Sequence, residues 1–108
     1  MCIRDRAGSA LAVRVPHHVV AQAVLSGIGP TVMTGAQLAG QAAVQTVEQA
    51  QEALLDVVDV FLDGGPLSPR ISTVIDATTD HLRMIRKGEL SLTQIRAVLP
   101  SVIDASAS

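Results

Sequence analysis

The sequence predicts an α+β domain in which helices pack on a twisted, mixed β-sheet. The first observation is the order of the expected elements, which combines strand–helix–strand crossovers with strands that follow one another directly. The second is the composition: 108 residues, 48% hydrophobic and 17% charged, are typical of one small globular domain and not of collagen-like, disordered or disulfide-rich chains. Phe61 is the only aromatic residue, so we expect a core of small, β-branched and leucine side chains.

The first expected elements alternate between strand and helix. Residues 10–15 have apolar side chains at alternate positions, which predicts a strand that ends at Pro16. Apolar residues then recur at helical spacing, and we expect a helix that runs to about Leu25 and stops at Gly27. The short apolar run 30–34 predicts a buried strand.

A loop rich in Gly, Ala and Gln, residues 35–44, precedes the second expected helix. Thr46 is a suitable N-cap residue, and Gln49 stands three positions later, as in a capping box. One face of this helix is apolar, with Val47, Ala50, Leu54 and Leu55. The outer face is acidic, with Glu48, Glu52 and Asp56. We expect the acidic face to be solvated, with a partner contact as the alternative.

The rest of the chain contains three strand-like apolar runs, at 58–62, 71–75 and 82–86. An Asp-Gly-Gly-Pro turn over 63–66 follows the first run, and the polar turn 78–80 separates the other two. Ser91 is a good N-cap residue and predicts a last short helix.

The ends of the chain differ from the segment between them. Residues 1–6 do not fit the pattern that follows and look like a non-native leader, so they are excluded from the fold prediction. The strand at 10–15 starts so abruptly that we expect earlier strands of its sheet to be encoded upstream. The prediction therefore assigns 7–100 to the C-terminal part of a larger domain and 101–108 to a flexible, Ala/Ser-rich tail.

Charge, cysteine and histidine content exclude several classes of protein. A formal net charge of −2 with eight Lys and Arg residues gives no general attraction to nucleic acid. Cys2 is the only cysteine, so no internal disulfide can form, which fits a reducing compartment. The three histidines, His17, His18 and His81, lack metal-ligand spacing, and we expect no metal site.

Residues 15–47 carry no Asp, Glu, Lys or Arg, but they do not predict a membrane span. Proline, histidine, glutamine and glycine interrupt the segment well below the roughly 20 consecutive apolar residues that a span needs. The N-terminus also lacks the apolar segment of a secretory signal. We therefore expect a cytoplasmic protein with no membrane contact.

Four polar residues lie on or at the ends of expected strands, within otherwise apolar sequence. They are Arg14, Ser72, Thr73 and Arg86. The guanidinium group of arginine offers a fixed fork of donors that suits a carboxylate or a phosphate. Each residue alone fits a solvent-facing strand position, but their joint occurrence near a loop of small residues favours a ligand site.

The loop of small residues, 34–40, directly follows an expected strand and could let a ligand approach the backbone closely. Gly35 and Gly40 have the spacing of a phosphate-binding P-loop. Gln41 and Ala42, however, stand where that motif needs Lys and Ser or Thr, so we reject a P-loop. Taken alone, the loop fits a structural connection better than a ligand site.

Five segments together resemble the YrdC-like threonylcarbamoyl-AMP synthases, over about residues 10 to 99. Asp-Gly-Gly-Pro followed by Ser-Thr-Val-x-Asp is the most specific pair, because a generic strand turn demands neither motif. The segments, in order, are Leu11-Ala12-Val13-Arg14-Val15-Pro16, the loop 34–40, Phe61-Leu62-Asp63-Gly64-Gly65-Pro66, Ser72-Thr73-Val74-Ile75-Asp76 and Met84-Ile85-Arg86-Lys87-Gly88.

The resemblance implies a partial YrdC-like domain of a cytoplasmic nucleotidyltransferase. Its substrates would be threonine, bicarbonate and ATP, with Mg²⁺ as part of the ATP complex and no tightly bound cofactor. Its products would be threonylcarbamoyl-AMP and pyrophosphate, and further tRNA-modification proteins would use the adenylate to make threonylcarbamoyladenosine in tRNA. By motif position, Arg14 and Ser72 would bind threonine, Arg86 would face the phosphates, and Thr34, Gly35, Ala36 and Gln37 would contact the ATP.

The sequence departs from the family pattern at several points. Gly35, Gln37 and Ala39 replace a serine, an asparagine and a second serine of the family loop, and Lys87 replaces a usual proline. The N-terminal Lys-x-Arg element and the tyrosine-containing strand of the family have no counterpart. The chain therefore resembles the C-terminal half of the domain, and we expect it to be inactive on its own.

Two other functions remain open at the level of sequence. A non-catalytic module that binds a nucleotide or double-stranded RNA would explain the altered loop. Basic residues late in the chain favour it, namely Arg70, Arg83, Arg86, Lys87 and Arg96. A small amino-acid-sensing regulatory domain fits the order of elements but leaves the two specific motifs unexplained.

Overall fold

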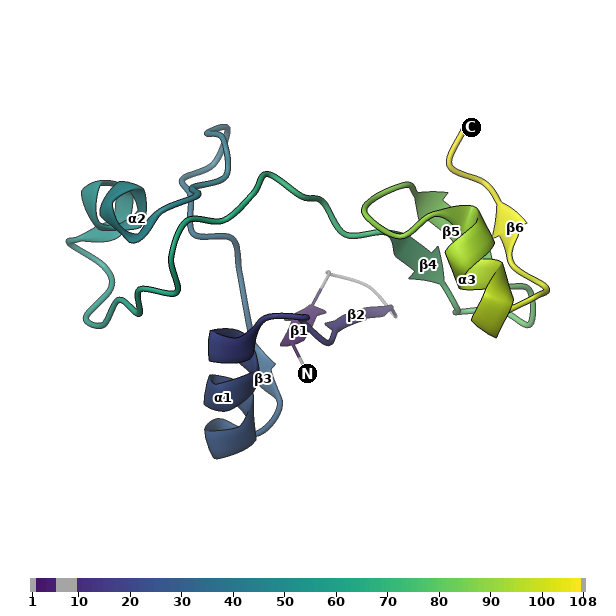
Figure 1. Ribbon diagram of the computed structural model, residues 1–108, viewed down its shortest axis with the longest axis horizontal. Helices are drawn as coiled ribbons and strands as arrows, with labels where there is room; N and C mark the ends of the chain where they lie inside the picture. Colours follow the sequence, from purple (N-terminus) through teal and green to yellow (C-terminus); the bar gives the residue numbers. More distant parts are fainter. Residues whose placement is uncertain (1, 6–9, 108) are drawn as a thin grey trace. The chain divides into compact units, whose positions relative to one another are not determined.

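The computed structural model describes residues 2–5 and 10–107, and it divides into two compact units, Met1–Ser68 and Pro69–Ser108. Each unit contains one small mixed sheet and at least one helix (Figure 1). The α+β prediction is therefore confirmed. The described strands form two three-stranded sheets, however, and not the single sheet that we expected.

The sheet of the first unit has the strand order β2-β1-β3 (Figure 1). Strand β1 (Cys2–Asp5) pairs antiparallel with β2 (Leu11–Arg14) and parallel with β3 (Thr31–Val32). It lies within the segment 1–6 that the prediction set aside as a leader. The expected strand at 10–15 is confirmed in its centre. The run at 30–34 contributes only the two residues of β3, and Val32 is 75% exposed, so the expected burial is wrong.

Helix α1 (Val19–Ile28) connects β2 to β3, as predicted, but it passes through Gly27. A glycine inside a helix costs only about 1 kcal/mol, which the rest of the helix can tolerate. The helix ends instead at Gly29, whose φ of 78° is unfavourable for residues with a Cβ atom, and whose N–H donates to the carbonyl of Leu25 at 2.8 Å.

Helix α2 (Val47–Leu54) begins where the capping pattern predicted. The hydroxyl oxygen of Thr46 accepts from the N–H of Gln49 at 3.3 Å. The Gln49 side chain accepts from the N–H of Gln45 at 2.9 Å, one residue before the expected donor. The acidic residues Glu48, Glu52 and Asp56 are exposed, as expected. The expected strand at 58–62 is wrong, because these residues have no strand partner and remain irregular.

The second unit contains the only fully packed cluster among the described residues. Strands β4 (Val74–Asp76), β5 (Arg83–Arg86) and β6 (Ile103–Asp104) form a sheet in that order, antiparallel and then parallel. Helix α3 (Leu92–Val98) makes the crossover from β5 to β6. Met84, Ile95 and Val102 are buried, and the partly buried residues Ile75, Leu82 and Leu92 pack against them.

The C-terminal end of the second unit was predicted to contain a helix capped by Ser91 and a flexible tail. The N-cap at Ser91 is confirmed, and Gln94 completes a capping box with it. The structure differs from the flexible tail expected after Ser101, because β6 lies in this segment and Val102 is only 1% exposed. Arg96 also donates from Nε to the carbonyl of Val102 at 3.0 Å. A buried valine and this hydrogen bond hold a segment whose Ala/Ser-rich composition alone predicts a flexible tail.

None of the helices in the described part of the chain is long and apolar enough to cross a membrane.

Candidate functional site

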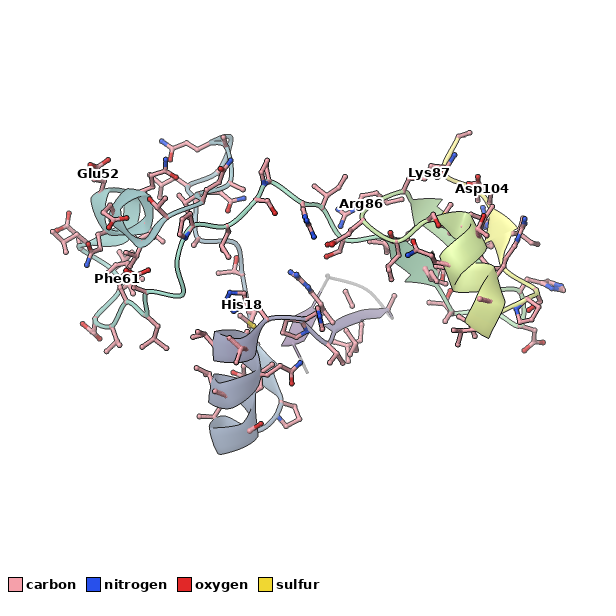
Figure 2. All side chains as sticks on the ribbon, in the orientation of Figure 1. His18, Glu52, Phe61, Arg86, Lys87 and Asp104 are labelled. Atoms are coloured by element: carbon pink, nitrogen blue, oxygen red, sulfur yellow. The ribbon has the colours of Figure 1, made fainter. Side chains whose placement is uncertain are left out.

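Two of the predicted site residues, Ser72 and Arg86, lie together in the second unit. Val74 pairs with Arg86 across the β4–β5 ladder, so Arg86 lies beside the segment that leads into β4. Its Nε donates to the carbonyl oxygen of Ser72 at 3.0 Å. Arg86 is exposed and Ser72 is half-buried. Figure 2 labels Arg86 and Lys87 at the end of β5.

The contact with Ser72 occupies only one of the three nitrogen atoms of the Arg86 guanidinium group, as far as the described residues show. The two terminal nitrogens can therefore donate to an anion. A guanidinium anchored through Nε and open at its other edge is suited to a phosphate or a carboxylate, because its remaining donors are parallel.

The segment around Ser72 is held tightly by the loop after β5. The hydroxyl of Thr73 donates to the carbonyl of Leu90 at 2.8 Å and accepts from the N–H groups of Gly88 and Leu90, both at 3.1 Å. The N–H of Glu89 donates to the carbonyl of Ile71 at 3.0 Å. We call residues 71–73 and 88–90 the hairpin-end clamp.

An exposed ion pair lies next to the hairpin-end clamp, and a glycine lies within it. Glu89 makes an ion pair with Arg70, although both side chains are more than half exposed. A Cβ atom on Gly88 would collide with the backbone of Ile71, Ser72 and Thr73, so only glycine fits there. The sequence marked Thr73 as a polar residue at a strand end, but it gave no sign of the partners of Thr73 or of the role of Gly88.

The other predicted site residues belong to the first unit. The loop after β3 forms a polar hollow of about 400 Å³, lined by Thr34, Gly35, Gln37, Leu38, Ala39, Gly40 and Gln41. Gly40 has a φ of 81°, and the N–H of Gln41 donates to the carbonyl of Leu38 at 3.1 Å, which closes the turn. The structure thus brings three of the four predicted ATP-loop residues to one hollow.

Ala36, the fourth of these residues, lines a different cavity of about 460 Å³. That cavity is mainly apolar and lies between α1, α2 and the segment 58–67. His18 lies against Gly64 there, since a Cβ atom on Gly64 would be 2.9 Å from its Cε1. Figure 2 labels His18 before α1 and Phe61 in the segment after α2.

Arg14 is the last residue of β2 and is exposed. The register pairs it with Cys2, the first residue of β1, and Cys2 also pairs with Thr31 at the start of β3. The loop 34–37 leaves β3 from its other end. Within the first unit, the chain therefore leaves β3 at Val32, one register position from the row that contains Arg14.

Two carboxylates in the second unit have a lowered pKa. Hydrogen bonds from the hydroxyl and N–H of Thr78 lower the pKa of Asp76, and the charge of Arg83 adds to this effect. Hydrogen bonds from the hydroxyl and N–H of Ser106 lower the pKa of Asp104, and Lys87 contributes at 3.3 Å. The described residues contain no group of three or more His, Cys, Asp or Glu arranged as metal ligands.

The late basic residues do not form an open positive surface. Arg70 pairs with Glu89, and Lys87 pairs with Asp104. Arg96 binds a backbone carbonyl. The same unit has four acidic residues, Asp76, Asp80, Glu89 and Asp104, against its five basic ones. Counterion release from nucleic acid needs unpaired cations along one face, which this arrangement does not favour.

The chain belongs to the Sua5/YciO/YrdC family, described as telomere recombination, whose model matches residues 5–88. It is 37% identical over 94 residues to a Mycobacterium leprae protein named "Putative threonylcarbamoyl-AMP synthase", covering 86% of this chain and 42% of that protein.

A Mycobacterium tuberculosis protein of the same name is 37% identical over 87 residues, with 80% of this chain and 40% of that protein covered. "Uncharacterized protein YciO" of Escherichia coli is 34% identical over 80 residues, with 72% and 39% covered. The chain thus spans about two fifths of the length of the curated relatives it matches. No solved structure gives a significant match.

Proposed function

We propose that this chain is the part of a threonylcarbamoyl-AMP synthase that binds ATP and threonine. The observation that carries the proposal is the contact between Arg86 and the Ser72 carbonyl, which joins two family motifs at one end of a hairpin. The family match and the names of the mycobacterial relatives support it. Because the chain spans only part of those relatives, the complete activity is proposed for the longer protein.

Each predicted site residue has a role in this proposal. Arg14 holds the threonine carboxylate, since a guanidinium fork matches a carboxylate. Ser72 lines the threonine pocket, and its fixed carbonyl anchors Arg86, which faces the phosphates of ATP. Thr34, Gly35, Ala36 and Gln37 form the adenylate side, with Gln37 offering an amide donor and acceptor.

The proposed reaction first forms the C–N bond of a carbamate, and then forms one mixed carbamic–phosphoric anhydride bond as one phosphoanhydride bond of ATP breaks. The threonine amine combines with bicarbonate to give a carbamate and water. A carbamate oxygen then attacks the α-phosphorus of ATP, and pyrophosphate leaves with Mg²⁺ bound to its oxygens. The protein positions the reactants and stabilises the negative charge that develops on the phosphate oxygens. The product feeds threonylcarbamoyladenosine formation in tRNA, which we place in the cytoplasm.

The first test is calorimetric titration of Mg²⁺–ATP into the 108-residue chain, with Arg86→Ala and Arg83→Ala variants. Both arginines are exposed on β5, which makes Arg83 a matched control. We expect Arg86→Ala to weaken ATP binding by about 2 kcal/mol, the scale of a hydrogen bond to a charged group. Arg83→Ala should leave the affinity unchanged.

A wild-type chain that binds no ATP would contradict the proposal, and equal losses in the two variants would remove Arg86 from the site. Mass spectrometry after incubation with threonine, bicarbonate and ATP provides a second readout. We expect no threonylcarbamoyl-AMP from this chain alone, because the family elements absent from its sequence would be needed for turnover.

RNA binding is not carried forward as a second function, because four of the five basic residues of the second unit already have partners within it.

A further inference from the structure

We propose that Thr73 is a positioning residue: its hydroxyl fixes the backbone of Ser72 and thereby holds Arg86 in its ligand-facing orientation. Thr73 touches no substrate in this inference and acts only through its neighbours. The role of Arg86 in ligand binding rests on the proposed function, but the effect of Thr73 on the orientation of Arg86 can be tested without any ligand.

The segment that leads into β4 lies just beyond the regular β4–β5 ladder. The β4–β5 pairing starts at Val74 and Arg86, so residues 71–73 lie outside the strand that follows them. Without other contacts, such a segment would fray, as strand ends do. Arg86 depends on this segment, because its Nε donates to the carbonyl of Ser72.

The Thr73 hydroxyl supplies the central contacts of the hairpin-end clamp. It donates once and accepts twice, which uses the full capacity of a hydroxyl group. All of its partners belong to Gly88 and Leu90, which are 15 and 17 positions further along the chain. It therefore ties the start of β4 to the end of β5 directly beside Ser72.

The Thr73 hydroxyl can make these contacts because residue 88 is a glycine. Its missing side chain lets the loop backbone lie directly on residues 71–73. At this close approach the N–H groups of Gly88 and Leu90 both reach the Thr73 oxygen at 3.1 Å. The ion pair of Arg70 with Glu89 is exposed and adds little, since solvent screens exposed ion pairs.

The test uses the ¹⁵N-labelled 108-residue chain with three variants. Thr73→Val keeps the shape of the side chain and removes the hydroxyl, and Thr73→Ser restores it. Thr93→Val is the matched control, because Thr93 is exposed on α3 and outside the clamp. The readouts are hydrogen exchange of the Gly88 and Leu90 amides and the NMR signal of the Arg86 Nε–H group.

We expect Thr73→Val to speed exchange of both amides about tenfold and to shift and broaden the Arg86 Nε–H signal; tenfold corresponds to about 1.4 kcal/mol. Thr73→Ser should restore both readouts, and Thr93→Val should change neither. An unchanged Arg86 signal in Thr73→Val would overturn the inference, as would failure of Thr73→Ser to restore it.

Ligand titration separates this inference from the proposed function. If the wild-type chain binds Mg²⁺–ATP, Thr73→Val should weaken binding several-fold and Thr73→Ser should not. If the wild-type chain does not bind ATP, the proposed function fails, while the loss and rescue of the Arg86 signal would still support Thr73 as the residue that orients Arg86.

Discussion

At the scale of single residues, Gly35 and the side chain of Gln37 lie next to each other in the loop after β3. Both residues depart from the family loop, where a serine and an asparagine are usual. In the structure, a Cβ atom on Gly35 would be 2.6 Å from Oε1 of Gln37, so the Gln37 amide occupies the space of a side chain at position 35. The Gln37 amide thus lies in the space that a side chain at position 35 would use, and it leaves a polar group in the hollow.

The paired carboxylate of Asp104 gives a prediction about pH. Its pKa is lowered in the folded chain by Ser106 and Lys87, so it stabilises the folded state above its unfolded pKa of about 3.8. That contribution should be lost as the pH falls below this value. We expect the midpoint of urea unfolding of the second unit to decrease as the pH falls below about 3.8, and to decrease less in Asp104→Asn.

Circular dichroism or NMR at several pH values would measure these midpoints. Asp80→Asn is a suitable control, because Asp80 is exposed in the β4–β5 turn. Its variant should retain the full acid dependence of the wild-type chain. A wild-type pH dependence that survives unchanged in Asp104→Asn would show that Asp104 contributes nothing to it.

At the scale of elements, the sequence predicted the caps well and the lone apolar runs poorly. Thr46 and Ser91 both cap helices, because a cap depends on residues three positions apart. The run at 58–62 has a strand pattern but no partner, and pairing is a property that local sequence does not contain. β6 was not predicted from the Ala/Ser-rich composition of residues 101–108. Its pairing with β5 and the burial of Val102 hold this segment in place.

In the candidate site, too, the sequence predicted some features, and others depend on the three-dimensional structure. The sequence and its family resemblance named Ser72 and Arg86, and the structure places them in contact. Three of the four loop residues that the resemblance named, Thr34, Gly35 and Gln37, line one polar hollow, whereas Ala36 lines another cavity. The close approach of Gly88 and the three contacts of Thr73 depend on how the segments that flank β4 and β5 meet in space, so no local pattern could have predicted them.

The two helix caps should have different effects on stability. Ser91→Ala should destabilise the second unit by about 1 kcal/mol, because it removes the N-cap of a helix that buries Ile95. Thr46→Ala removes a similar cap from α2, which buries no residue, so unfolding of the second unit should not change. Urea titrations that follow the NMR signals of Met84 and Ile95 would measure both effects.

Equal shifts of the urea midpoint in these two variants would contradict this prediction. They would mean that α2 and α3 contribute to one cooperative transition, which the absence of buried residues in α2 argues against.

At the scale of the whole molecule, the two units differ in how much apolar surface they bury. Among the residues whose burial the structure describes, the buried cluster of Met84, Ile95 and Val102 belongs to the second unit, and Pro16 is the one buried residue of the first. In the first unit many large apolar side chains are exposed, including Val13 at 52%, Val15 at 70% and Val19 at 81%. Burial of apolar surface is the main favourable term in folding, so we expect the first unit to be the less stable one.

Hydrogen exchange of the intact chain tests this expectation by comparing two helices. Helix α1 has ten residues and α3 has seven, so helix length alone would favour slower exchange in α1. Burial predicts the reverse, because α3 packs Ile95 into the core while α1 buries no residue. We expect the α3 amides to exchange at least tenfold more slowly, since about 1.4 kcal/mol of extra local stability is enough for that difference. Slower exchange in α1 would show that the first unit is stabilised by more than its own described contacts.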